Sequence, residues 1–310
     1  MSSKVRIGIS GWRYAPWRGD FYPRGLAQKD ELAFASRAVG SIEINGSFYA
    51  LQTPERYAGW AAQVPEGFVF SVKAPRFITH VRRLRDIHEP LANFLASGLF
   101  QLRHKLGPIL WQFPPSFKFD PALFEQFLQQ LPHHGRTARQ LARQCSERLQ
   151  RDDYLDIPAD ALLRHCVEIR HASFIDPAFV ELLQRHNIAL VVADTAGKWP
   201  WIEELCGDFV YLRLHGDQQL YSSGYGDQAL ERWGQRIELW RQGRQPADAR
   251  RIPGAPGPER GPGGARDVYC YFDNDTKVRA PYDARQLMER LGLADTLTVQ
   301  PGLVPQGDWK

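Results

Sequence analysis

Two oppositely charged residues, Glu168 and Arg170, are separated by one position in the stretch CVEIRH, residues 166–171. Side chains of an extended chain alternate between the two faces of a sheet, so these two charges would share one face. Val167 and Ile169 would share the other face, where apolar side chains indicate burial. A buried charge is costly unless it is paired or hydrogen-bonded. The charged face therefore looks either at water or into a pocket that uses the charges.

The same alternation of polar and apolar side chains recurs near the ends of several other short apolar runs. In a barrel of parallel strands the outer face packs on helices and must be apolar, so we expect the polar rows to face the barrel axis. Because they lie near the carboxyl ends of their strands, they mark the face where such barrels carry their sites. The polar members are Glu43, Asn45, Ser71, Lys73, Gln112, Asp194, Tyr211, Arg213, His215, Tyr269, Tyr271 and Asp273.

Short β-branched and aromatic runs alternate with amphipathic segments, which is typical of parallel strands joined by helices. The predicted strands are 5–10, 41–45, 68–73, 109–113, 166–170, 189–194, 209–215 and 267–273. The predicted helices are 29–39, 89–102, 121–131, 177–186, 227–242 and 283–291. The pattern predicts a single (β/α)8 TIM-barrel-like domain with parallel strands over residues 1–310. The alternative is a doubly wound sheet, but GISGWRYAPWRG lacks the G-x-G-x-x-G phosphate turn.

Two insertions interrupt the pattern, each between a predicted helix and the next strand. Residues 133–165 contain a helical stretch in which Leu141, Cys145 and Leu149 form one apolar stripe. Residues 244–266 are rich in Pro, Gly and Arg with almost no apolar side chain, so we expect a disordered loop there. Helix-to-strand connections lie at the face opposite the catalytic loops, so neither insertion is expected to cover the site.

The bulk composition allows a large core and favours anionic partners. Hydrophobic residues make up 43% and aromatic residues 12% of the 310 residues, and the formal net charge is +4. That charge alone is too small to indicate nucleic acid. The start of the chain has no apolar leader and no run of about 18 apolar residues could span a membrane, so we expect a cytoplasmic protein without membrane contact. Four scattered cysteines are expected to be reduced.

The segments that follow the predicted strands interleave aromatic and basic residues. Examples are GWRYAPWRGDFYPRG after the first strand, GSFYALQTPER after the second and APRFITHVRRLRD after the third. In a barrel these loops converge on one rim, and such a rim suits a sugar, a base or a phosphate-bearing ligand through stacking and charge.

Several stretches closely resemble the YecE-like family, also called domain of unknown function 72. They run from about Val5 to Asp283 and include IGISGWRYAPWRGDFYP, SIEINGSFYALQTPER, KLGPILWQFPPSFKFD, CVEIRHASF, VVADT and YLRLHG. The resemblance implies a TIM-barrel-like fold and no established reaction. Similar proteins often have YFNN where residues 272–275 of this chain read FDND. The matching motif positions are Trp12, Glu43, Asn45, Tyr49, Lys73, Gln112, Glu168, Arg170, Asp194, Arg213 and His215.

The residue types favour an enzyme that uses metal-independent acid–base chemistry on a phosphate- or carboxylate-bearing ligand. The expected catalytic residues are Glu43, Lys73, Glu168, Asp194 and His215. Carboxylates and a histidine can move protons near neutral pH, and a lysine whose pKa is lowered can form a Schiff base. The expected substrate-binding residues are Trp12, Asn45, Tyr49, Gln112, Arg170, Arg213 and Tyr271. No cofactor is predicted.

One alternative is a divalent-metal barrel of the sugar isomerase, epimerase or apurinic-endonuclease kind, with Glu168, Asp194, His215 and Asp273 as an arc of ligands. A metal ion is not needed to balance the charge of these acids, because three cations, Lys73, Arg170 and Arg213, can do so. A further alternative is a protein that binds nucleic acid, or acts in repair, without turnover. The basic HVRRLRD loop motivates it, and its mark would be an affinity that falls steeply with salt. The alternative to any functional site is a purely structural one, in which the charged residues form a buried ion-pair network that only fills the barrel.

Overall fold

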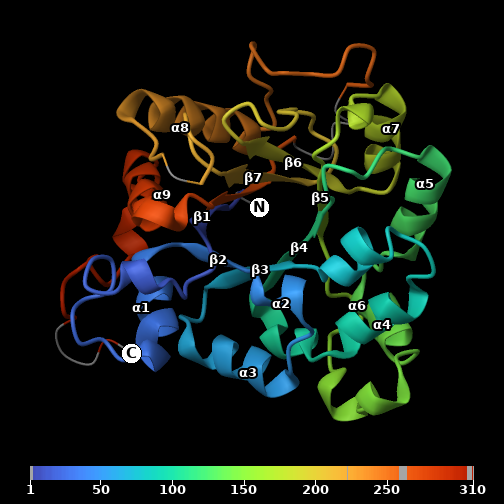
Figure 1. Cartoon of the computed structure of the whole chain (residues 1–310), viewed down its shortest axis with the longest axis horizontal. Coiled ribbons are helices and arrows are strands. Elements are labelled where there is room, and N and C mark those ends of the chain that lie inside the picture. Colours follow the sequence, from blue (N-terminus) through green and yellow to red (C-terminus); the bar gives the residue numbers. More distant parts are fainter. Residues whose placement is uncertain (1–2, 222, 258–263, 306–308, 310) are drawn as a thin grey trace.

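The computed structural model describes residues 3–221, 223–257, 264–305 and 309. Its strands close into a parallel barrel in which each strand pairs with the next in sequence and β8 pairs with β1 (Figure 1). The predicted (β/α)8 TIM-barrel fold is therefore confirmed. The strands are β1 Val5–Ser10, β2 Ser41–Ile44, β3 Val69–Lys73, β4 Leu106–Gln112, β5 His165–Glu168, β6 Ala189–Asp194, β7 Phe209–Leu214 and β8 Asp267–Phe272.

Helices surround this barrel on its outside (Figure 1). Three of them begin with a side-chain cap followed by proline at the first helical position, a combination that satisfies a free backbone N–H and fixes φ for the first turn. The caps are Thr53, Asp120 and Asp176. The helices are α1 Glu31–Ala38, α2 Gly46–Tyr49, α3 Pro54–Gln63, α4 His88–Ala96, α5 Pro121–Gln130, α6 Gly135–Ala142, α7 Pro177–Arg185, α8 Asp227–Arg241 and α9 Arg279–Arg290.

The strands bury apolar side chains on both of their faces. Their outer faces pack with the helices in one large cluster that includes Ile44, Val167 and Leu212. A second, smaller cluster fills the barrel interior and includes Val191 and Tyr211. Successive strand residues thus belong to different clusters, which is the alternation that the sequence predicted.

The predicted helix over 89–102 is broken in two. α4 stops at Ala96, and a 3-10 segment follows at Leu99–Lys105. Gly98 between them has φ of 101°, which only glycine adopts readily. A Cβ at this position would lie 2.3 Å from the Cα of Pro54, so the turn also lets α3 approach closely. The sequence argument did not predict α3 or the short α2.

The first insertion is only partly helical. α6 ends at Ala142, so Cys145 and Leu149 lie beyond it, and the predicted stripe is not carried by one helix. Figure 1 shows α6 beside α4, which it contacts. The helix therefore packs on α4 in the outer layer of helices.

The described part of the second insertion is tied to residues 203 and 204 after β6. The backbone N–H of Arg250 donates to the Glu203 carboxylate at 2.8 Å, and that of Ile252 donates to the Glu204 carboxylate at 2.7 Å. Ile252 is buried. Two buried carboxylates thus anchor residues 244–257 without an apolar run, which the sequence argument did not anticipate. Residues 258–263 of the loop predicted to be disordered lie outside the described residues.

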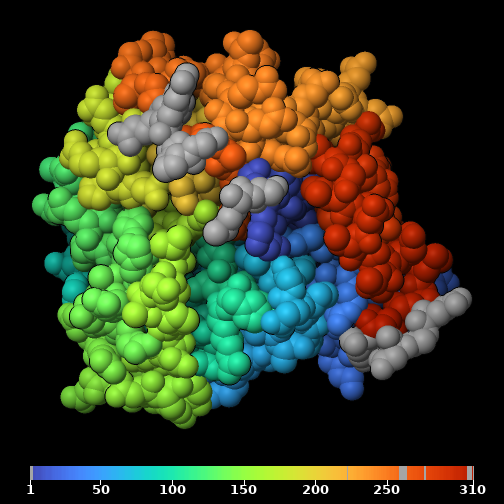
Figure 2. All heavy atoms as spheres, turned by 180° about the vertical axis from the view of Figure 1, so that it is seen from behind, coloured from blue at the N-terminus to red at the C-terminus, as the bar shows by residue number. Residues whose placement is uncertain are grey.

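The two ends of the barrel differ. Figure 2 shows the face that carries the helix-to-strand connections, with the start of the chain (blue) near its centre. The polar strand ends lie at the other face. Within the described ranges, no helix combines the length and the apolar composition that a membrane crossing requires.

Candidate functional site

The guanidinium of Arg213, on β7, lies at the centre of a buried polar cluster. It is paired twice with Glu43 from β2, through Nε to Oε2 at 3.1 Å and Nη2 to Oε1 at 2.9 Å. Nη1 donates to Glu168 Oε2 on β5 at 2.7 Å, and Nη2 donates to Asp273 Oδ2 after β8 at 2.9 Å. The polar rows of four strands thus meet inside the barrel, and the charged face of CVEIRH looks into it.

The carboxylate of Glu43 has all of its acceptor positions occupied. Besides Arg213, it accepts from Ser10 Oγ at 2.5 Å and from the Tyr211 hydroxyl at 2.6 Å. Glu43 is 0% exposed. Burial and the neighbouring Glu43 raise the pKa of Tyr211 far above its ordinary value, so this phenol stays protonated. Glu43 is therefore a positioning group for Arg213 rather than the open base that the sequence predicted.

Glu168 is held as an ion by a second arginine. Its Oε1 accepts from Gln112 Nε2 and from Arg170 Nε, both at 2.8 Å. Burial alone would raise the pKa of Glu168, but the charges of Arg170 and Arg213 outweigh burial and hold this pKa well below its usual range. A carboxylate in this state accepts hydrogen bonds at neutral pH and does not donate a proton.

His215 and Asp273 form the side of the cluster nearest β8. His215 Nδ1 lies 3.0 Å from Asp273 Oδ2, and its Nε2 lies 3.4 Å from Arg213 Nη1. Burial would raise the pKa of Asp273, but Arg213 and His215 lower it to about 2. Because a guanidinium can only donate, Nε2 accepts from Arg213, which leaves the imidazole proton for Nδ1 on the side of Asp273, although Nδ1 makes no well-directed hydrogen bond there.

Lys73, at the end of β3, differs from the other charges of the cluster. The side chain is almost fully buried, and Nζ lies 4.1 Å from the centre of the Phe48 ring. Nζ forms no ion pair and no hydrogen bond with any residue that the structure describes. Burial, followed by the charge of Arg213, lowers the pKa of Lys73 to about 8. An amine with this pKa can gain and lose its proton near neutral pH.

One further cation, Arg170, and the imidazole of His80 lie near Lys73 at the mouth of the barrel. The guanidinium of Arg170 lies 3.7 Å from the centre of the Trp199 ring and uses only Nε for Glu168. His80 contacts Phe48 with ring centres 5.1 Å apart. Burial first, and then the charges of Lys73 and other nearby cations, lower the pKa of His80 to about 4. The mouth thus has a positive potential that favours an anion.

Asp194 does not belong to this cluster, contrary to the prediction. On β6 the interior positions are Ala189, Val191 and Ala193, so Asp194 lies on the outer face. Its Oδ2 accepts from the Tyr225 hydroxyl at 3.1 Å, and burial raises its pKa to about 6. The sequence argument placed Asp194 by its position at the strand end, since both alternate rows along LVVAD are otherwise apolar.

The predicted arc of four metal ligands is consequently not assembled. Asp194 faces away, and the guanidinium of Arg213 lies between Glu168 and Asp273. Over the described part of the chain, no group of three or more His, Cys, Asp or Glu side chains is arranged to hold a metal ion. The geometry of these residues thus does not fit the ligand arc that the alternative required.

The remaining predicted residues lie at different depths. Tyr271 is fully buried, with its hydroxyl 2.8 Å from Ser41 Oγ and 2.7 Å from Ser71 Oγ, so it lies in the layer beneath the cluster. Asn45 Nδ2 donates to Ser10 Oγ at 2.8 Å, which links the rim to the cluster. Tyr49, at the end of α2, is 73% exposed, and Trp12 lines a hollow together with Asn45.

Sequence reasoning missed several residues of the site. Ser10 lies at the inward end of β1 and could have been found by the same count of alternate positions. His80 lies in a π-helical turn, Phe77–Val81, and Trp199 lies in the loop after β6. Nothing in the sequence shows that these two loops approach Lys73 and Arg170, because only the closed barrel brings them together.

Two curated relatives are similar to part of this chain in sequence. Aligned segments of YunF, a UPF0759 protein of Bacillus subtilis, are 32% identical over 121 residues, 36% of this chain and 41% of the relative. YecE, a UPF0759 protein of Escherichia coli, is 30% identical over 130 residues, 41% of this chain and 44% of the relative. The chain thus matches less than half the length of either curated relative.

Two crystal structures share the fold. A DUF72 family protein of Thermotoga maritima has a TM-score of 0.69 at 23% identity, covering 93% of this chain and 99% of its own. One from Enterococcus faecalis has a TM-score of 0.66 at 18% identity, covering 98% of this chain and 100% of its own. The family model for protein of unknown function DUF72 matches residues 6–307. Because that model spans nearly the whole chain, this chain belongs to the DUF72 family.

Proposed function

We propose that this chain is an enzyme that carries out metal-independent acid–base chemistry on a phosphate- or carboxylate-bearing ligand at the carboxyl-terminal mouth of its barrel. The observation that supports this most directly is the state of Lys73. A buried lysine that has no anionic partner among the described residues is unfavourable for folding, and its pKa of about 8 suits a group that gains and loses a proton.

The anion would bind beside Lys73, at Arg170, whose guanidinium is not saturated. Arg170 has both Nη groups free of hydrogen bonds to described residues, and its stacking on Trp199 fixes its plane. A planar guanidinium with two free N–H groups suits a phosphate or carboxylate. A bound anion would also stabilise the ammonium form of Lys73 after it has taken a proton.

Arg213 takes a different role from the one that the sequence suggested. A guanidinium has five N–H groups, and the contacts with Glu43, Glu168, Asp273, Ser10 and His215 use them all. Arg213 therefore fixes the carboxylates rather than holding the ligand. In this scheme Glu168 orients Arg170, and Lys73 moves the proton.

The test is deuterium exchange into the bound ligand. Sugar phosphates and 2-oxo acids are screened for ligands that raise the melting temperature, and those that bind are incubated with the enzyme in D2O. We expect deuterium uptake at an acidic C–H of the ligand, a loss of at least a hundredfold in Lys73→Met, and weaker binding in Arg170→Gln. Lys29→Met, an exposed control, should match the wild type. Uptake that persists in Lys73→Met would refute the role of this amine.

A further inference from the structure

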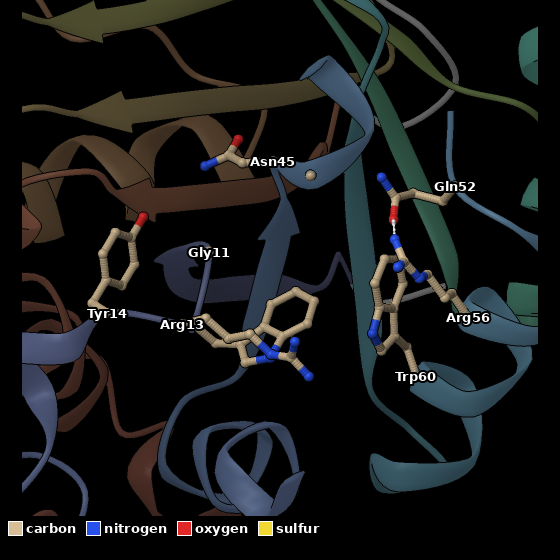
Figure 3. A pocket seen from close by; sticks show the side chains of 9 residues that line it. Gly11, Arg13, Tyr14, Asn45, Gln52, Arg56 and Trp60 are labelled. Carbon is tan, nitrogen blue, oxygen red and sulfur yellow. Dashed lines mark hydrogen bonds between the residues drawn. The ribbon is translucent and has the colours of Figure 1, made fainter. Parts of the chain in front are cut away.

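A hollow of about 460 Å³ lies beside the polar cluster, between the loops after β1 and β2 and helix α3 (Figure 3). Figure 3 shows Tyr14, Arg13 and Asn45 on one side, and Gln52, Arg56 and Trp60 on the other. Volumes of this order are typical of small-molecule sites. The hollow shares no lining residue with the contacts of Lys73 and Arg170, so it is a separate part of the mouth.

The charge of this hollow is one-sided. Arg13 and Arg56 both line it, and no acidic residue does. Arg13 forms no ion pair with a described residue, while Arg56 Nη1 donates to the Gln52 amide oxygen at 3.1 Å. The partner that orients Arg56 is thus a neutral amide and not a carboxylate. Two exposed guanidinium groups without an ion-paired carboxylate among the described residues favour an anionic ligand.

Aromatic rings form the inner wall of the same hollow. Trp12 and Trp60 meet edge to face, with ring centres 5.4 Å apart and planes at 84°, so the two indoles hold each other in place. Trp12 is buried, and its Nε1 has no hydrogen-bond partner among the described residues. Asn45 Oδ1 likewise has none. The wall therefore offers rigid ring surface together with one donor and one acceptor that the fold itself leaves unused.

We propose that this hollow binds a small planar aromatic ring that carries an anionic group, with the ring against Trp60 and the anion between Arg13 and Arg56. This is the chemistry of a mononucleotide, in which a heteroaromatic base and a phosphate are joined by a short linker. The site stands independently of the chemistry proposed for Lys73. The contact from Asn45 to Ser10 connects the hollow to the polar cluster, so a bound ring would lie at the edge of that cluster.

The test is calorimetric titration of the full chain with AMP at 50 mM salt. We expect saturable one-to-one binding that Arg13→Gln with Arg56→Gln weakens at least tenfold. Arg244→Gln is the matched control, since Arg244 is exposed after α8 and also donates to a neighbouring glutamine. Trp60→Leu should weaken AMP several-fold and leave inorganic phosphate unaffected. Adenosine, which lacks the anion, should bind the wild type about as weakly as AMP binds the double arginine variant.

Three outcomes would overturn the proposal. AMP that fails to bind, or that binds equally well to the double arginine variant, would show that the hollow is not its site. Equal affinity for inorganic phosphate and AMP would show that the aromatic ring of the ligand contributes nothing to binding, contrary to the proposal. A single-stranded decanucleotide that binds with a steep dependence on salt while AMP does not bind would indicate a nucleic-acid surface instead of a small-molecule pocket. Lys73→Met should bind AMP normally, which separates this site from the proposed acid–base chemistry.

Discussion

Arg213 and Glu43 are joined by two parallel contacts inside the barrel, Nε to Oε2 at 3.1 Å and Nη2 to Oε1 at 2.9 Å, with both side chains at most 1% exposed. A pair of this kind adds little net stability over an apolar core, but losing one partner leaves the other charge buried and unpaired.

Replacing Arg213 by methionine should therefore destabilise the protein strongly. The change leaves the buried carboxylates of Glu43, Glu168 and Asp273 without their shared cation. We therefore expect a loss of about 3–5 kcal/mol in the free energy of unfolding. Urea unfolding at pH 7 measures it. Arg232→Met, on the exposed face of α8, should change stability by less than about 1 kcal/mol. A loss for Arg213→Met no larger than that of the control would show that water or rearrangement satisfies the three carboxylates.

Replacing Lys73 by methionine should stabilise the protein at neutral pH. The folded state lowers the pKa of Lys73 from 10.5 to about 8, so folding disfavours the ammonium form. The resulting penalty is present below pH 8 and disappears as the pH rises from there towards 10.5. We expect Lys73→Met to gain up to roughly 3 kcal/mol at pH 7 and less at pH 10. A variant that is less stable than the wild type at pH 7 would contradict an unpaired, buried amine.

For Asp194, an acid, we expect stability to depend on pH in the opposite direction from Lys73. Burial raises its pKa from 3.8 to about 6, so the folded state favours the protonated form. Its contribution to stability is present below pH 4 and is lost as the pH rises through 6. Asp194→Asn should therefore gain stability relative to the wild type between pH 4 and pH 8, by about 2–3 kcal/mol. Parallel urea series for the two proteins at both pH values measure this difference. Identical pH profiles would mean that Asp194 is solvated.

The amine of Lys73 should also react as a nucleophile. At pH 8 about half of it is neutral, and a 2-oxo acid such as pyruvate would form an imine with loss of water, which borohydride reduces to a stable secondary amine. Mass spectrometry should find one adduct per chain, located on Lys73 and absent from Lys73→Met. Lys29→Met should keep the adduct. Labelling spread evenly over several lysines would show that Lys73 has no special reactivity.

Much of this fold follows from local patterns in the sequence. β1 and β6 have the predicted bounds, because each is an apolar run with turn residues on both sides. Helix α3 was missed because Tyr57 is its only buried residue, and because Thr53 followed by Pro54 was not interpreted as a helix start. The break at Gly98 depends on contact with Pro54, which is distant in sequence, so local patterning could not show it.

The site was predictable in its members and less so in their roles. Counting alternate positions brought Glu43, Glu168 and Arg213 together correctly, since the pleat fixes which face they occupy. Along β6 both alternate rows are apolar apart from Asp194 itself, so the same count could not show that Asp194 lies on the outer face. That Arg213 is saturated while Lys73 has no partner depends on distances across the barrel, which strand patterns do not encode.

The contacts of Arg213 also bear on how the chain folds during synthesis. Its partners Glu43 and Glu168 are 170 and 45 residues earlier in the sequence, whereas Asp273 is 60 residues later. Contacts between residues so distant in sequence form late in folding. The chain must first lose the entropy of the long loop between them, before the contact contributes any stabilisation. A nascent chain that has not yet released β8 keeps this side of its barrel open, and the last carboxylate reaches Arg213 only when the final strand joins β1.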